Sequence, residues 1–228
     1  MRPRESQIEK PAAGFVLAGG RSSRMGRDKA LLSFAGRPLV AHAISILHDA
    51  GLTASIAGAG EVLRSLAPSL LCSPPVIEDP EPDLGPLAGI CAALHSTAAR
   101  MAAFLPVDTP FLPPSLITYL VRHASITGQA VTVPTVNGFA ETFPVVLDRA
   151  TLPVLKRELE AGRDGCFSAF QAAASALNQT IGSTAVELLA QSGQVSHPLG
   201  LAPFCWFLNL NDAATLATAE ALAIKDIA

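Results

Sequence analysis

The stretch AAGFVLAGG, residues 12–20, is an apolar run of strand length that ends in two glycines. A run that is apolar throughout is typical of a strand buried on both faces of a parallel sheet. The stretch MAAFLPVD, residues 101–108, has the same character and ends in a carboxylate. Two such runs, separated by helical patterns, predict an α/β fold whose ligands bind where the strands end.

Strand and helix patterns alternate along the rest of the chain. Helices are predicted over residues 38–50, 61–66, 87–98, 113–121, 150–159 and 212–222. Strands are predicted over residues 53–58, 74–78, 130–136, 139–147 and 204–210, and the sequence leaves open whether 130–136 and 139–147 join the main parallel set. The alternation predicts a single-domain, doubly wound, Rossmann-like sheet that is mostly parallel, with helices on both faces. We expect this domain to span residues 12–228, after a flexible polar leader over residues 1–11.

The composition argues against several classes of protein. Of the 228 residues, 50% are hydrophobic and 15% are charged, and the formal net charge is −3. An apolar, weakly acidic chain is expected to fold compactly and not to bind nucleic acid through bulk positive charge. The sequence has neither an uninterrupted apolar run of about 20 residues nor the apolar core of a secretory signal. We therefore expect a cytoplasmic protein without a membrane partner.

The few charges are concentrated in two places. Residues 1–29 carry seven basic and three acidic side chains, whereas four carboxylates fall within residues 78–83. In a parallel sheet, the loops that follow the strands share one edge. We therefore expect Arg24 and Lys29 to face Asp108 across one site.

These loops offer groups that suit a polyphosphate. Gly19 and Gly20 let the backbone approach a ligand closely with its N–H groups, and Arg24 and Lys29 add positive charge. A carboxylate at the end of a buried strand, here Asp108, suits a Mg²⁺ ion that bridges phosphate oxygens. The loop matches neither the P-loop nor the dinucleotide fingerprint, so another arrangement must bind the nucleotide.

Four segments closely resemble motifs of the bacterial molybdenum cofactor guanylyltransferases, within the wider family of sugar-phosphate-type nucleotidyltransferases. The segments are LAGGRSSRMGRDKALLSFAGRPL (17–39), EDPEPDLGPLAGI (78–90), LPVDTPFLPPSL (105–116) and FLNLND (207–212). The first motif is long and specific, and all four occur in the family's order. The resemblance extends from residue 13 to residue 222.

The resemblance implies a Mg²⁺-dependent enzyme that transfers GMP from GTP to the phosphate of molybdopterin and releases pyrophosphate. The acceptor's own anionic phosphate would attack in line, so no covalent intermediate is expected. By this resemblance Arg24, Lys29 and Asp108 act in catalysis, and Asp108 also binds the metal. The residues implied to contact GTP are Leu17, Ala18, Gly19, Gly20, Lys29, Asp79 and Asp108, and those implied on the acceptor side are Asn209 and Asn211.

Some positions bear on the choice of substrate. Gly19 and Asp28 favour GTP, because the sister cytidylyltransferases typically differ at these two positions. Ala57 or a neighbour stands where the family has a nucleotide-contacting asparagine. After the late helix, where the family has several basic residues, this chain offers only Arg163.

Alternative functions remain open at this stage. One is a molybdopterin cytidylyltransferase, or another nucleotidyltransferase that acts on a phosphorylated acceptor. From a different class, a non-catalytic GTP-binding factor for molybdoenzyme assembly would keep the nucleotide pocket, although intact Lys29 and Asp108 argue against it. The expected partners are GTP and molybdopterin, with molybdoenzymes or their chaperones as candidate protein partners, and we expect a monomer or a weak oligomer.

Overall fold

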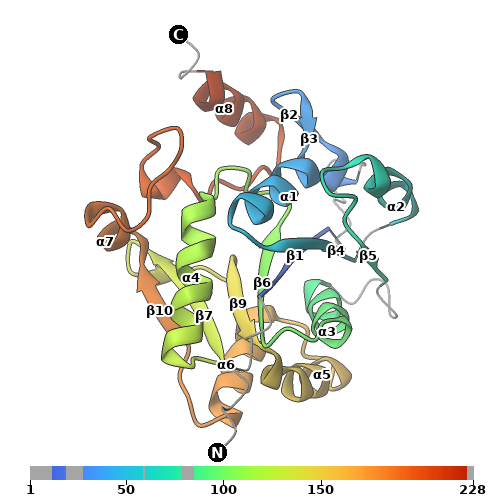
Figure 1. The fold of residues 1–228 in the computed structure, drawn as a ribbon, viewed down its shortest axis with the longest axis vertical. Coiled ribbons are helices and arrows are strands. Elements are labelled where there is room, and N and C mark those ends of the chain that lie inside the picture. The colour runs from blue at the N-terminus through green and yellow to red at the C-terminus, as the bar shows by residue number, and fades with distance from the viewer. Residues whose placement is uncertain (1–11, 19–27, 59, 79–84, 225–228) are drawn as a thin grey trace, which may run out of the picture.

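One mixed sheet forms the centre of the molecule (Figure 1). The computed structural model describes residues 12–18, 28–58, 60–78 and 85–224. The main sheet follows the order β10-β7-β9-β6-β1-β4-β5, with β8 paired to β7. Its strands are β1 (Ala13–Leu17), β4 (Thr53–Ala57), β5 (Val76–Ile77), β6 (Met101–Pro106), β7 (Val131–Val136), β8 (Phe139–Ala140), β9 (Val145–Asp148) and β10 (Gly182–Ala185), and β2 (Ser33–Phe34) and β3 (Arg37–Pro38) form a separate hairpin.

Most of the strand pairs in this sheet are parallel. Strand β1 pairs in parallel with β4 and β6, β4 with β5, and β7 with β10. Strand β9 runs antiparallel to both of its neighbours, β6 and β7, and β8 is antiparallel to β7. The predicted mostly parallel sheet is therefore confirmed, and both late strand segments join it.

Helices cover both faces of the sheet, as the sequence predicted. The helices are α1 (Leu39–Asp49), α2 (Glu61–Leu66), α3 (Pro86–Ser96), α4 (Pro114–Thr127), α5 (Leu152–Glu160), α6 (Cys166–Ala176), α7 (Val186–Gln191) and α8 (Ala213–Ile224). Side chains of α1, α2, α4, α7 and α8 share one apolar core with one face of the sheet. Side chains of α3, α5 and α6 form a second core on the other face.

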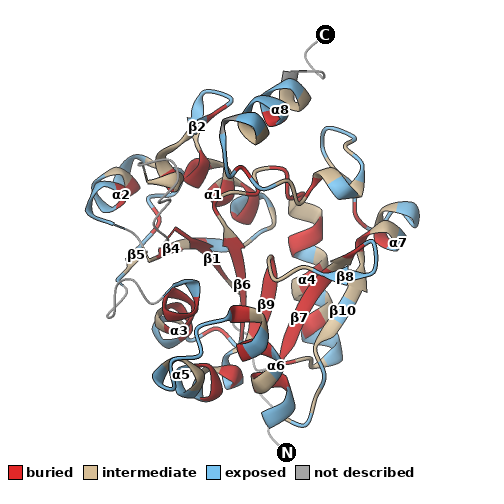
Figure 2. Cartoon of the chain, turned by 180° about the vertical axis from the view of Figure 1, so that it is seen from behind, coloured by how far each residue is buried: buried red, intermediate tan, exposed pale blue. Residues whose placement is uncertain are grey.

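The alternation of side chains along β1 explains why the first apolar run is continuous. Val16 points into the first core, whereas Phe15 and Leu17 point into the second. Phe15 stacks on Phe104 of the neighbouring strand, with ring centroids 5.2 Å apart. Figure 2 shows the central strands as mostly buried. A strand between two helical layers has no solvent face, so it needs no polar alternation.

The predicted strand over residues 204–210 is wrong. The chain there forms a 3-10 helix, η4 (Pro203–Cys205), followed by irregular backbone. Its amide groups bond locally, for example from Leu208 to the carbonyl of Cys205 at 3.2 Å. The aromatic composition suggested a strand, but Pro203 opens a turn, and the side chain of Trp206, 1% exposed, anchors the segment in the core.

Other differences concern the second half of the chain. Helices α6 and α7 and strand β10 were not predicted from the sequence. The single strand expected over residues 139–147 is divided into β8 and β9. The last helix was predicted correctly, and Asp212 accepts a hydrogen bond from the Thr215 amide at 2.8 Å where it begins. In the part of the chain that the structure describes, no helix is long and apolar enough to span a membrane.

Candidate functional site

The carboxyl ends of β1 and β6 lie side by side at a point where the strand order reverses. From β1 the chain continues through β4 and β5 on one side, and it then returns to β6 on the other side. Leu17, the last residue of β1, pairs with Pro106 of β6 and Ala57 of β4. Such a switch point is where open α/β sheets bind their ligands.

An ion pair occupies this edge. The Lys29 ammonium lies 2.6 Å from Asp108 Oδ2 and also donates a hydrogen bond to Asn211 Oδ1. Lys29 begins a short 3-10 helix that is held by Asp28, whose carboxylate accepts from the Ala30 amide at 3.1 Å. The side chains of Lys29 and Asp108 are each 18% exposed, so water screens the pair only in part.

The segment after Trp206 brings Asn211 to this ion pair. The buried Trp206 indole donates to the Leu201 carbonyl at 2.7 Å and fixes the start of the segment. The Leu210 amide then donates to the backbone carbonyl of Asp108 at 2.9 Å. Residues 182 positions apart in sequence, Lys29 and Asn211, meet in this way.

One oxygen of Asp108 is left for a ligand. Asp108 Oδ1 is buried and has no hydrogen-bond partner among the described residues. A buried carboxylate oxygen without a partner is costly, and a cation is the group that would satisfy it. Together with Asn211 Oδ1, it offers hard oxygen donors of the type that Mg²⁺ and Mn²⁺ prefer. The residues present therefore fit a divalent metal ion.

Several residues expected at the site can be compared with the structure. Leu17 and Ala18 are buried at the end of β1, and the Ala18 amide donates to the Ala57 carbonyl at 2.9 Å. Asn209 is exposed, and its side chain has no hydrogen bond within the described chain, so Asn211 alone of the asparagine pair joins the cluster. The expected site residues that lie outside the described residues are Gly19, Gly20, Arg24 and Asp79, and the predicted leader, residues 1–11, lies outside them as well.

Two departures from the family pattern have structural consequences. Ala57 is 1% exposed beside the end of β1, and its methyl group offers no hydrogen bond to a nucleotide. Arg163, the basic residue that the sequence offers on the acceptor side, makes two hydrogen bonds of 2.6 and 2.8 Å to Glu158. These hydrogen bonds lower the pKa of the Glu158 carboxyl and raise the pKa of Arg163.

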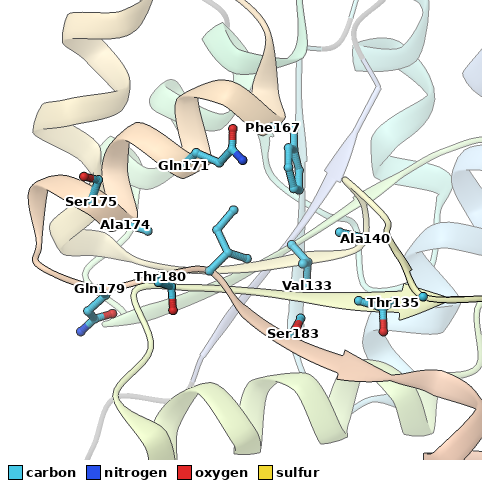
Figure 3. A pocket seen from close by; sticks show the side chains of 12 residues that line it. Val133, Thr135, Ala140, Phe167, Gln171, Ala174, Ser175, Gln179, Thr180 and Ser183 are labelled. Carbon is cyan, nitrogen blue, oxygen red and sulfur yellow. The ribbon is translucent and has the colours of Figure 1, made fainter.

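The sequence did not indicate a pocket that lies between α6 and strands β7 and β10 (Figure 3). Its volume is about 530 Å³. The residues that line it are Val133, Thr135, Gly138, Ala140, Phe167, Gln171, Ala174, Ser175, Gln179, Thr180, Ile181 and Ser183. The available signal was weak: it consisted of the hydroxyl residues scattered from 180 to 184, with no motif around them.

Comparison with known proteins identifies a family. The family model of the MobA-like NTP transferase domain matches residues 14–177. A molybdenum cofactor guanylyltransferase from Pseudomonas putida is 34% identical over 156 residues, which cover 67% of this chain and 78% of that relative. Another, from Xanthomonas euvesicatoria pv. vesicatoria (strain 85-10), is 38% identical over 115 residues, or 50% of this chain. The match spans 56% of that relative's length.

Solved structures support the same fold. The molybdopterin-guanine dinucleotide biosynthesis protein A from Archaeoglobus fulgidus has a TM-score of 0.74 at 19% identity, covering 93% of this chain and 99% of that one. Rv0371c from Mycobacterium tuberculosis H37Rv, in complex with manganese, has a TM-score of 0.65 at 18% identity, covering 93% of this chain and 99% of that one. At such identities these similarities concern the arrangement of strands and helices.

Proposed function

Because the chain belongs to the MobA-like NTP transferase family, we propose that it transfers GMP from GTP to the phosphate of molybdopterin and releases pyrophosphate. The observation that supports this most directly is the cluster of Lys29, Asp108 and Asn211 at the carboxyl edge of the sheet. The guanylyltransferase names of the relatives favour guanine as the base and molybdopterin as the acceptor.

A divalent metal ion, which we take to be Mg²⁺, would be held by Asp108 and Asn211. Asp108 contributes the buried Oδ1 that has no partner in the described chain, and Asn211 contributes its amide oxygen. When bound, the ion supplies charge neutralisation for the phosphate oxygens of the nucleotide.

The Lys29 ammonium contacts a negatively charged group in the structure, and we expect it to contact another when the nucleotide is bound. In the structure, the Asp108 carboxylate neutralises the Lys29 ammonium, and the Asn211 amide oxygen accepts a hydrogen bond from it. In the proposed complex with GTP, the same ammonium binds the phosphate oxygens together with Arg24. These two cations then balance the negative charge on the phosphate oxygens, and such charge stabilisation is the main catalytic contribution expected in phosphoryl chemistry.

The backbone at the end of β1 sets which groups can contact the base. The Ala18 N–H is already bonded to Ala57, so its carbonyl oxygen is the group available to a nucleotide. A carbonyl accepts hydrogen bonds, and the Watson–Crick edge of guanine carries N–H donors that suit it. Leu17 supplies an apolar contact beside it.

No group of the protein needs to form a covalent bond with the nucleotide. The acceptor's phosphate is anionic at neutral pH and is itself the nucleophile, so attack on the α-phosphorus of GTP requires alignment and no general base. Asp108 Oδ2 accepts a hydrogen bond from Lys29, so this carboxylate serves as a ligand and not as a nucleophile. Isolation of a GMP adduct of the protein during turnover would contradict this mechanism.

Pyrophosphate release tests the proposal. It is measured in the presence of Mg²⁺ with each of the four nucleoside triphosphates, with and without molybdopterin. We expect release with GTP and molybdopterin together. Equal release with CTP would point to a cytidylyltransferase, and GTP binding without release would point to an assembly factor. The variant Asp108→Asn is expected to lower kcat by about 10²–10³-fold. Asp49→Asn, an exposed carboxylate on α1, is the matched control.

A further inference from the structure

The pocket between α6, β7 and β10 is lined only by uncharged residues. Hydroxyl and amide groups of Thr135, Gln171 and Ser183 reach its surface, and within the described chain their side chains have no hydrogen bond. Figure 3 shows Phe167 and Gln171 on the α6 side and Val133 and Ser183 on the strand side. Such a lining suits a neutral ligand with an aromatic face and polar edges, and it does not suit a phosphate.

The register of the sheet relates this pocket to Asp108. Val131 of β7 and Ala102 of β6 both pair with Leu147 of the strand between them. Continuing this register along both strands brings Thr135 level with Pro106, two residues before Asp108. Two strand spacings of about 4.8 Å separate these strands, which is about 10 Å in all. One end of the pocket, at Thr135 and Gly138, therefore lies toward the carboxyl edge, whereas its other end, at Gln179 and Thr180, lies level with the start of β7.

The order of the strands separates this pocket from the base of the nucleotide. Strand β1, against which we place guanine, neighbours β6 on the side opposite to β9 and β7. A nucleotide that extends from β1 to Asp108 leaves the β7 side of the edge for the second substrate. That substrate reaches Asp108 with its phosphate, and its remaining part extends toward the pocket.

We propose that this pocket binds the pterin ring system of the acceptor, a neutral planar heterocycle with N–H donors and carbonyl and ring-nitrogen acceptors along its edge. This inference rests on the proposed function. Phe167 offers an aromatic contact for the ring system, and Thr135, Gln171 and Ser183 offer hydrogen bonds to its edge. A volume of about 530 Å³ lies within the usual range for such ligand sites.

Fluorescence anisotropy measures the binding of 6-hydroxymethylpterin to the full chain. Because this probe carries no phosphate, the measurement tests pterin binding in the pocket independently of GMP transfer. Gln171→Leu and Thr135→Val are each expected to weaken binding about threefold to tenfold, the effect of one lost neutral hydrogen bond. Gln191→Leu, at the exposed end of α7, is the matched control and is expected to bind as the unmodified chain does. In the transfer assay, Gln171→Leu should raise the KM for molybdopterin and leave the KM for GTP unchanged.

The other outcomes overturn the inference. The inference fails if the pterin does not bind at millimolar concentration. It also fails if all variants bind the pterin equally, because the pterin would then bind elsewhere. Guanosine is the competitor, and displacement of the pterin by an equal concentration of guanosine would assign the pocket to the nucleotide instead. If the pterin binds as expected but GMP transfer is absent, the proposed function fails while the pocket remains a pterin site.

Discussion

Replacement of Lys29 by methionine is expected to separate metal binding from catalysis. The Lys29 ammonium contacts Asp108 Oδ2 at 2.6 Å and Asn211 Oδ1. We assign Asn211 Oδ1 and the other carboxylate oxygen of Asp108, Oδ1, to the metal site. A metal ion that binds there without nucleotide must compete with this ammonium. The methionine side chain keeps the length of lysine but removes the competing charge, so Lys29→Met should bind the metal more tightly while losing activity.

The size of the effect follows from the geometry. A hydrogen bond to a charged group contributes about 1.5–3 kcal/mol, and both side chains of the ion pair are 18% exposed, which favours the lower end of that range. About 1.5 kcal/mol corresponds to roughly tenfold in affinity. We therefore expect Lys29→Met to bind Mn²⁺ about tenfold more tightly in the absence of nucleotide, and to lose about 10²–10³-fold in GMP transfer because a positioned cation is missing.

Mn²⁺ titration followed by electron paramagnetic resonance, with the full chain and no nucleotide, measures this affinity. The matched control is Arg37→Met, because Arg37 bonds to the Ala41 carbonyl at 3.2 Å and Ser45 Oγ at 2.8 Å and has no part in the metal site. Unchanged or weaker Mn²⁺ binding by Lys29→Met would refute the reasoning. An equal gain in Arg37→Met would refute it too, since the effect would then reflect net charge alone.

Two further predictions concern stability. Gly14→Ala should destabilise the fold by about 1–3 kcal/mol in urea unfolding, because the new Cβ would lie 3.0 Å from Leu47 Cδ2. Gly60→Ala is the control and should change the stability little, because its new Cβ would have no heavy atom within 4 Å. Equal unfolding midpoints for the two variants would contradict this prediction. Burial lowers the pKa of His42 from its usual 6.5, and the Phe34 carbonyl accepts a hydrogen bond from its Nε2 at 2.8 Å. The unfolded chain then takes up a proton that the folded chain does not, so stability should fall as the pH drops below 6.5. His42→Gln should flatten the dependence of Tm on pH between about pH 7 and about pH 5, and an unchanged slope would contradict the assignment.

The first half of the fold was predictable because its signals are local. Continuous apolar runs identified β1 and β6, and prolines at helix starts identified α1 and α4. Asp108 could be singled out as a ligand because it lies two residues after the end of a buried strand. A pattern of this kind is decided by the layers above and below one strand, so a short window of sequence contains it.

The second half was less predictable because its structure depends on distant partners. The segment 204–210 has the composition of a strand, yet the burial of Trp206 and the bond from Leu210 to Asp108 decide its path. Helix α6 is rich in alanine and small residues, which carry little periodic signal, and β10 is only weakly apolar. The pocket between them is made by residues from three strands, a helix and the segments that connect them, so no single motif encodes it.

The antiparallel strand β9 links the two parts of the candidate site. Had β7 paired directly with β6, its residue Thr135 would lie one strand spacing, about 5 Å, from the β6 edge. Insertion of β9 doubles that separation while keeping β6 and β7 parallel, because β9 is antiparallel to both. In the arrangement we propose, this separation sets the distance between the phosphate and the heterocycle of an acceptor that binds at Asp108 and in the pocket at once. A substrate with its phosphate attached directly to the ring system would be too short to do so, and the strand order thus selects for an acceptor with an intervening arm.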